Sequence, residues 1–537
     1  MKLNGPFFKR SEFAISAVLA LLILAWNLKN SFEFGRLAWV PTYDDISYFN
    51  DALLRYQKFI TGNVFSLIHD AFSNPPHSPV ITFQAIISYI LFGVQDWIPY
   101  VSLVWIPFWV LLLTVSYARH AGNGKWILLI YIATTPLLNA SVVEFRPDIG
   151  NGILTTLAIV FSIYTITENK QILFTPTLLA AGFLLGGALL LKPTAAIYTV
   201  ALLGFAVLTT LVGLRLTREA SVVSGVKSGL LILLIGFILS LPYYLASGKE
   251  IIEYTYNALI RDKKIWAVNL STLDHALYYL VGKGGNFMLG AHLWISVASF
   301  PLLLVFRGKL SSKAKLRFYV LISTTVFGYL VVAANSVKSY FIGVVFQALL
   351  VCVSFLIFCE LMRLYSGRKA YWPAVSALFL ITIVSIQPVR FWRQHDPVIE
   401  QEVRETVTQV NKAVRSIVSI NNKPNEVYIM FSGFLNVDVI TYDLLQWGIQ
   451  DTRFDDLFWT PYEEDPLVIA SRALERSDVV IAATRWARVA QSRLPSTTIL
   501  PSTLSLVEKN PAFVLFRSIP SGQGLIHIYA RKSIVGN

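Results

Sequence analysis

Long runs of apolar residues alternate with short polar stretches over the first 390 or so residues of this chain. Eleven of these runs are long enough to cross a bilayer core of about 30 Å as helices. They begin near Phe13, Ile98, Trp126, Ile149, Phe174, Ala195, Ser228, Phe287, Phe318, Tyr340 and Tyr371. The pattern predicts a polytopic α-helical membrane protein. No small-residue cleavage site follows the first run, so we interpret it as a retained span rather than a signal peptide.

A twelfth apolar run, Val80 to Phe92, is short and follows the helix-breaking sequence NPPHSP. If this run lies along the surface, the clusters of Lys and Arg between the other runs all fall on one side of the membrane. If it spans, every later loop changes sides and this agreement is lost. We therefore predict eleven spans, a cytoplasmic amino terminus and an outer location for everything after about Pro388.

The first outer loop is predicted to hold an interfacial helix from Asp44 to Ile60. Its apolar stripe and its polar face are on opposite sides of a helical wheel. The stripe contains Ile46, Phe49, Leu53, Tyr56 and Ile60, and the polar face contains Asp44, Tyr48, Asp51, Arg55 and Lys58.

The tail has a different pattern, in which helix-like stretches alternate with the β-like stretches EVYIMF, DVVIAA, FVLFRSI and GLIHIYAR. This pattern predicts a soluble α/β domain over residues 388–537, after a transmembrane domain over 1–387. The acidic sequences YEED and FDD of the tail could suggest metal ligands, but we interpret them as solvated loop residues.

Composition supports a membrane protein, because 55% of the residues are hydrophobic and 14% are charged. The formal net charge of +13 does not indicate nucleic-acid binding, since the basic residues form short clusters between apolar runs. His292 is the main ionisable residue inside a predicted span. Transporters usually need charges near the bilayer midplane, so this scarcity favours an enzyme over a conduit.

Acids and bases gather instead at the outer ends of the predicted spans. Each has a simple structural explanation, since acids cap helices and basic side chains extend toward the interface. Together they predict a site that handles an anion. The residues are Asp44 and Asp45; His77; Arg146 and Asp148, next to Glu144; Lys192; Arg261 and Lys263; and Lys338 and Tyr340.

The order of these motifs resembles the GT-C superfamily of integral membrane glycosyltransferases over roughly residues 1 to 390. The motifs are an acidic pair after the first span, a Pro-rich turn, the Asp of FRPD, a KPT turn and a late K-x-Y. The resemblance implies that Asp44 is the catalytic base with Asp45 beside it, and that Asp148 occupies a second acidic position. It implies that Lys192, Lys338 and Tyr340 lie near a lipid phosphate. His77 departs from the family pattern, because HPP is replaced here by PPH.

A protein of this family takes a sugar from a polyprenyl or dolichyl phosphate and transfers it, with inversion, to an acceptor hydroxyl. The resemblance implies a glycan, lipid or protein acceptor, contact with membrane lipids and no required cofactor, although a divalent cation serves one branch. We expect a bacterial inner membrane location. The alternatives are a ligase or polymerase of the O-antigen type, and a transporter or flippase of lipid-linked sugars.

Overall fold

The computed structural model describes residues 8–535 except 42, 123, 169–174, 218–220, 262, 264–266, 366–395, 421–425, 451, 458–464 and 493–494. The side chains of residues 43, 44, 258, 259 and 495 also lie outside the description. The chain forms two compact units. The first comprises residues 1–28, 68–84 and 100–391, and the second 29–67, 85–99 and 392–537. The predicted span near Tyr371 and the predicted boundary at residue 388 fall outside the described residues.

The first unit is built from helices, as predicted. In the described part of the chain, seven helical segments are long and apolar enough to cross a membrane. They are α1 (Arg10–Phe34), Ile98–Ala121 with α5 (Ile98–Ser102) and α6 (Trp105–Tyr117), α9 (Pro147–Glu168), Pro193–Thr217 with α11 (Ala196–Thr217), α12 (Val222–Tyr256), α17 (Ser312–Ala334) and α18 (Val344–Tyr365). These helices establish a multi-pass membrane protein, while the total of eleven spans stays a prediction.

Three predicted spans are shorter helices in the structure. They correspond to α7 (Gly124–Ala133), α10 (Pro176–Leu191) and α16 (His292–Phe306). The first is interrupted after Ala133, and α8 (Pro136–Ala140) begins at a proline. A residue before proline is biased away from helical dihedrals, which explains the break. The Val80 run is α4 (Pro79–Phe92), whose 14 residues extend only about 21 Å. That length agrees with a helix that does not span.

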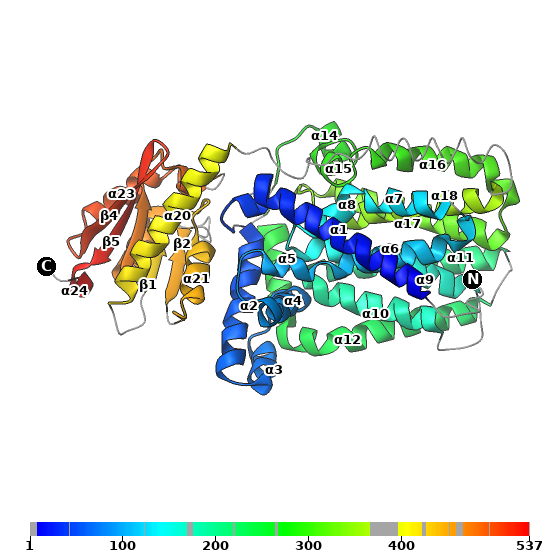
Figure 1. The fold of residues 1–537 in the computed structure, drawn as a ribbon, viewed down its shortest axis with the longest axis horizontal. Coiled ribbons are helices and arrows are strands. Elements are labelled where there is room, and N and C mark those ends of the chain that lie inside the picture. Colours follow the sequence, from blue (N-terminus) through cyan, green and yellow to red (C-terminus); the bar gives the residue numbers. More distant parts are fainter. Residues whose placement is uncertain are drawn as a thin grey trace. The chain divides into compact units, whose positions relative to one another are not determined.

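Glycines allow α10 to approach its neighbour α12 closely, and Figure 1 shows α9, α10 and α12 side by side. A Cβ on Gly182 would lie 2.6 Å from Ile235, and one on Gly236 would lie 2.6 Å from Leu185. Without a side chain, both backbones come close together, a common way of packing membrane helices. This packing fixes the end of α10, where Lys192 lies.

The first unit also contains α14 (Thr272–Leu277) and α15 (Lys283–Met288), while α3 (Val64–Ser73) crosses the division between the units. His292 begins α16 and is fully buried. Its Nε2 lies 3.1 Å from the carbonyl oxygen of Tyr131 and 3.2 Å from Oγ1 of Thr134. The one histidine in a predicted span interior is therefore a packed helix-joining residue.

The second unit contains a five-stranded sheet of order β2-β1-β3-β5-β4. The strands are β1 (Glu426–Ile429), β2 (Arg453–Asp456), β3 (Val479–Ala483), β4 (Phe513–Ser521) and β5 (Gly524–Arg531). The strands β2, β1 and β3 are parallel, and β5 is antiparallel to both of its neighbours. All four β-like stretches of the tail are confirmed as strands, as is the long helix α20 (Pro397–Val418).

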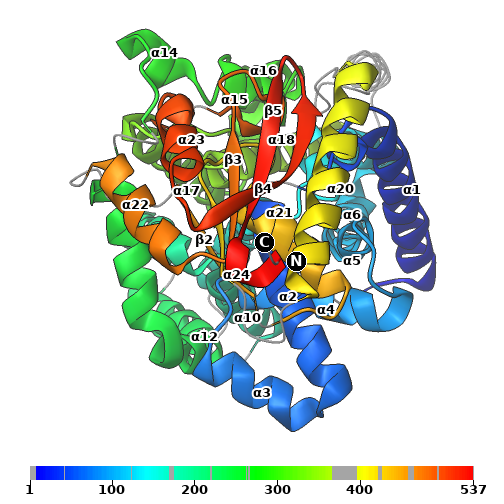
Figure 2. The ribbon, with the colours of Figure 1, turned by 90° about the vertical axis from the view of Figure 1, so that its left-hand side faces the viewer.

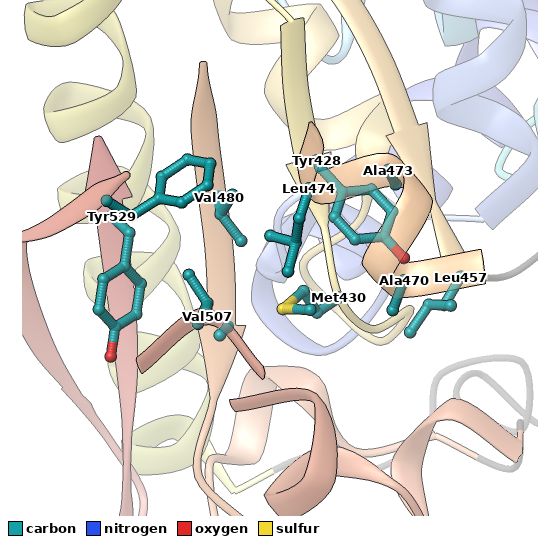
Figure 3. Packing of buried hydrophobic residues seen from close by; sticks show 11 residues of the cluster. Tyr428, Met430, Leu457, Ala470, Ala473, Leu474, Val480, Val507 and Tyr529 are labelled. Atoms are coloured by element: carbon teal, nitrogen blue, oxygen red, sulfur yellow. The ribbon is translucent and has the colours of Figure 1, made fainter. Parts of the chain in front are cut away.

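Helices cover the sheet, as Figure 2 shows. They are α20, α21 (Val437–Gln446), α22 (Pro466–Arg476) and α23 (Leu500–Glu508), and α24 (Lys532–Val535) follows the last strand. One core cluster joins Met430 and Val480 of the sheet region to Leu474 of α22 and Val507 of α23 (Figure 3). An α/β fold is thus confirmed for the described part of the tail.

Strand β2 corrects one prediction, because FDD lies in this strand and not in a loop. Asp455 and Asp456 pair with Tyr428 and Ile429 of β1. The strand has only four residues and lies at the sheet edge, where charged residues are tolerated and protect the edge from further pairing. The sequence YEED lies outside the described residues apart from Asp465, which caps α22.

The first-loop helix α2 (Tyr43–Thr61) belongs to the second unit and packs on α21. Nδ2 of Asn50 donates to the carbonyl oxygen of Asp438 at 2.9 Å. The expected division into an apolar stripe and a solvated polar face is wrong at three positions, one of which is Tyr48, only 8% exposed. Arg55 is 1% exposed and Ile60 is 59% exposed. The polar face is partly covered because it packs against protein instead of facing water.

Candidate active site

Four polar residues lie together at the amino terminus of α9 in the first unit. Glu144 and Arg146 precede the helix, and Asp148 is in its first turn. Proline at the first helical position and an acid in the first turn favour a helix start here. All three side chains are buried, with residue exposures of 5%, 8% and 7%. The fourth, Lys192, follows the last residue of α10.

Ion pairs and a hydrogen bond join this cluster. Lys192 Nζ contacts Oδ1 of Asp148, and Nε of Arg146 lies 3.4 Å from Oε2 of Glu144. The Tyr340 hydroxyl donates to the same Glu144 oxygen at 2.9 Å. Charged groups this deeply buried are found in proteins only when they are paired. The structure therefore brings together four of the predicted site residues, Arg146, Asp148, Lys192 and Tyr340.

Phe341 is a member of this cluster that the sequence did not indicate. Cζ of Arg146 lies 4.7 Å from the centre of its ring, and Nζ of Lys192 lies 5.5 Å from the same centre. Both distances are within the range of a cation–π interaction. The ring thus holds two cations from different helix junctions next to each other. We call Glu144, Arg146, Asp148, Lys192, Tyr340 and Phe341 the α9 cluster.

Two adjacent cations of this kind can stabilise an anion. Their own acids lie beside them, so the α9 cluster carries no excess of formal charge before a ligand arrives. A phosphate that reached the two cations would compete with Asp148 and Glu144 for them. Asp148 is already paired with Lys192, so one of its carboxylate oxygens is engaged by a cation. The geometry therefore favours an electrostatic role for Asp148 over a role as general base.

Lys338 is placed differently from its predicted neighbour Tyr340. Its Nζ donates to the carbonyl oxygens of Val332 and Ala333, at 3.0 and 2.8 Å, and lies 5.1 Å from the ring centre of Tyr279. These carbonyls belong to the last turn of α17, which a cation satisfies well. Burial lowers the pKa of the Lys338 ammonium. Lys338 therefore caps the carboxyl end of α17.

Three other candidates are exposed in the first unit. His77 packs its ring against Tyr254, with centres 4.9 Å apart. Arg261 ends the helical turn Asn257–Arg261 that follows α12, and Lys263 comes two residues later. The structure does not place these three side chains in the buried α9 cluster. Their predicted contact with substrate stays a prediction.

The acidic pair belongs to the second unit, at the start of α2. Asp45 is 1% exposed, and its Oδ1 lies 3.2 Å from Nη1 of Arg36. Arg36 begins the short 3₁₀ helix Arg36–Ala38. Asp44 is in the first turn of α2, and its side chain lies outside the described residues. Within the described residues, no group of three or more His, Cys, Asp or Glu side chains could hold a metal ion.

Solved structures of other proteins share this fold. ArnT from Cupriavidus metallidurans in the apo state matches with a TM-score of 0.54 at 12% identity, covering 95% of this chain and 97% of that chain. The same enzyme bound to undecaprenyl phosphate gives a TM-score of 0.53. The archaeal oligosaccharyltransferase AglB from Archaeoglobus fulgidus, in complex with an inhibitory peptide and a dolichol-phosphate, gives 0.50 at 10% identity, covering 96% and 73%.

The arabinofuranosyltransferase AftD from Mycobacteria also matches, with a TM-score of 0.53 at 11% identity. The match covers 97% of this chain and 40% of that longer chain. No protein-family model and no curated protein sequence matches this chain. At these low identities the likeness establishes the fold, which is the GT-C fold predicted from the motifs.

Proposed function

We propose that this multi-pass membrane protein of the GT-C fold is an inverting glycosyltransferase. Its donor is a sugar on polyprenyl or dolichyl phosphate, and its acceptor is a hydroxyl group on the outer face of the membrane. The observation that carries this proposal is the contact of two cations, Arg146 and Lys192, with the same aromatic ring, that of Phe341. The lipid phosphates bound to ArnT and AglB are further support.

The two cations have a defined task in this reaction. As the bond between the anomeric carbon and the phosphate oxygen breaks, negative charge grows on the departing phosphate. Fixed positive groups stabilise that charge more strongly in the transition state than in the ground state, and this difference accelerates the reaction. Arg146 and Lys192 are held in place before the donor arrives, so little reorganisation is needed.

The acceptor hydroxyl must lose its proton as it attacks the anomeric carbon. A carboxylate within hydrogen-bond distance can take this proton, a contribution of about 10² to 10⁴ in rate. We assign this role to Asp44. Asp45 is held by Arg36 and is better suited to orienting its neighbour or the acceptor. The proton moves to Asp44, the sugar to the acceptor oxygen and the bonding electrons to the phosphate.

Binding of undecaprenyl phosphate to the full chain in lipid nanodiscs tests the first step. We expect saturable binding that is weakened at least tenfold by Arg146→Met or by Lys192→Met. Lys249→Met, at an exposed position of α12, is the matched control and should bind normally. Binding that is equal in all four proteins would remove the α9 cluster from the donor site.

Transfer is then tested with a panel of synthetic polyprenyl-phosphate sugars and membranes from the host. We expect a glycosylated product and release of the lipid phosphate. Passage of a labelled lipid-linked sugar across proteoliposomes without any transfer product would instead support a transporter. The bacterial inner membrane location stays a prediction.

A further inference from the structure

An open groove of about 650 Å³ lies within the second unit, and none of the residues of the α9 cluster lines it. Its volume is in the range of about 300–1,000 Å³ that small-molecule sites occupy. The walls come from the segment before α2, the loop before α5 and one face of α20. Among the residues that line it are Trp39, Asp96, Trp97, Glu400, Gln401 and Gln446. We call this the α20 groove.

One wall of the groove is rigid. Trp39 is 9% exposed, and its ring stacks on Phe434 with centres 4.9 Å apart and an interplanar angle of 16°. Arg404 of α20 donates to the carbonyl oxygens of Leu37, Ala38 and Trp39, the last at 2.8 Å. These bonds fix the backbone that carries Trp39. The groove is thus formed before any ligand enters it.

The polar groups in the groove are of mixed type. Glu400 is 7% exposed, and its carboxyl group interacts with the indole of Trp39. Asp96 interacts with Tyr442 and Gln446. Gln401 and Gln446 are exposed, and their amides can both donate and accept hydrogen bonds. The groove therefore offers carboxylates and amides along its length, with aromatic rings beside them.

The charge of the groove argues against an anionic ligand. Its lining includes two carboxyl groups, Asp96 and Glu400, against one guanidinium. That guanidinium, from Arg404, is already engaged by three backbone carbonyls. A phosphate or an acidic peptide would meet an excess of negative charge, whereas neutral hydroxyl groups would find acceptors and donors. The partly exposed ring of Trp97 can pack against the C–H face of a sugar ring.

We propose that the α20 groove binds a neutral saccharide, which is the acceptor of the transfer reaction. The identification as acceptor rests on the proposed function, whereas saccharide binding does not. The backbone relates the groove to the acidic pair, because Trp39 precedes Asp44 by five residues. Five residues span at most about 18 Å, so a saccharide of several units in the groove extends to the neighbourhood of Asp44.

The test is saturation-transfer NMR with the full chain in lipid nanodiscs, since a maltoside detergent would itself present a sugar. The probes are maltotetraose, cellotetraose, mannotetraose and galactotetraose, with inorganic phosphate as the anionic comparison. Gln401→Trp fills the groove from an exposed position of α20. Gln409→Trp places the same side chain on an exposed position of the same helix outside the groove lining, and is the matched control.

We expect at least one saccharide to bind saturably to the wild-type chain and to the Gln409→Trp variant. Gln401→Trp should weaken that binding at least tenfold while leaving the melting temperature unchanged. Binding of none of the saccharides, equal binding to both variants, or displacement of the saccharide by phosphate would overturn the proposal. If the saccharide binds in the groove but no sugar is transferred to it, the groove proposal stands as a binding site and its role as acceptor site fails.

Discussion

Lys192 and Asp148 are 44 positions apart in the chain, and their side chains form an ion pair that joins the end of α10 to the first turn of α9. Removing one partner of a buried pair typically costs about 3–5 kcal/mol, because the other charge is left uncompensated. The Lys192 side chain is 25% exposed, so we expect Lys192→Met to lose less than this. Thermal unfolding followed by tryptophan fluorescence measures the loss.

The double variant Lys192→Met, Asp148→Asn separates stability from function. It removes both charges, so we expect the melting temperature to recover most of the way to the wild-type value. Binding of undecaprenyl phosphate should stay weak if Lys192 contacts the phosphate. Recovery of binding together with stability would mean that Lys192 acts only by neutralising Asp148.

Phe341 should determine how well the two cations are positioned. A cation–π contact contributes about 0.5–2 kcal/mol according to its exposure. Phe341→Leu removes two such contacts at similar side-chain size, and we expect roughly a tenfold weaker binding of undecaprenyl phosphate. Phe341→Tyr keeps the ring and should stay within about twofold of wild type. If the leucine variant binds as well as the tyrosine variant, the ring only fills space.

Substitutions in the acidic pair of α2 distinguish a helix-capping role from a role as catalytic base. Asn caps a helix about as well as Asp, but it cannot accept a proton in this reaction. Asp44→Asn should therefore reduce transfer at least about a hundredfold with normal stability. Asp45→Asn should have a smaller effect on transfer, because Arg36 can still bond the amide oxygen. The reverse order of effects would exchange the roles of the two residues.

Asp96 should make stability depend on pH in an unusual direction. Burial raises the pKa of this carboxyl group above its ordinary value of 3.8. The folded protein then binds this proton more tightly than the unfolded chain, so stability increases as the pH falls through the raised pKa toward 3.8. Asp96→Asn should remove this gain and should be the more stable protein at neutral pH. Melting temperatures of the wild-type chain and of Asp96→Asn between pH 7 and 4 measure this pH dependence. Asp274→Asn, at an exposed position, is the control.

The predicted topology is tested with reporters. A reporter fused after Asn537 should be active in the outer compartment, and one fused after Arg218 should be active in the cytoplasm, because the basic clusters fall on one side only when eleven helices span. A cytoplasmic carboxyl terminus would mean that α4 crosses the membrane. It would also place the acidic pair and the tail on opposite sides, against their common compact unit.

The members of the α9 cluster that could be predicted from the sequence are charged residues next to a proline. Arg146, Asp148 and Lys192 adjoin Pro147 and Pro193, and such junctions mark helix ends in a sequence. Phe341 could not be found in this way, because a phenylalanine in an apolar chain carries no signal of its own. The capping role of Lys338 could not be predicted from the sequence for another reason. Its partners are backbone carbonyls, whose availability depends on where α17 ends.

For the fold as well, features set by the local sequence could be predicted, whereas features that depend on packing partners could not. Apolar length predicted the membrane helices, but α7 and α10 end early because each is soon followed by a proline, Pro136 and Pro193. Strand β2 has four residues, two of them acidic, and forms only because β1 provides a partner. Arg55 has the sequence pattern of an exposed residue on α2, and it is buried because α2 packs within the second unit.

The bonds from Arg404 to the backbone around Trp39 have a consequence for biosynthesis. The two residues are 365 positions apart, and a ribosome adds about 5–20 residues per second, so roughly 20–70 s separate their synthesis. During that interval the segment leading to the acidic pair has already emerged without the helix that fixes it. The first loop must therefore stay unassembled until the carboxyl-terminal part of the chain has been synthesised, and during that interval it is most vulnerable to proteolysis.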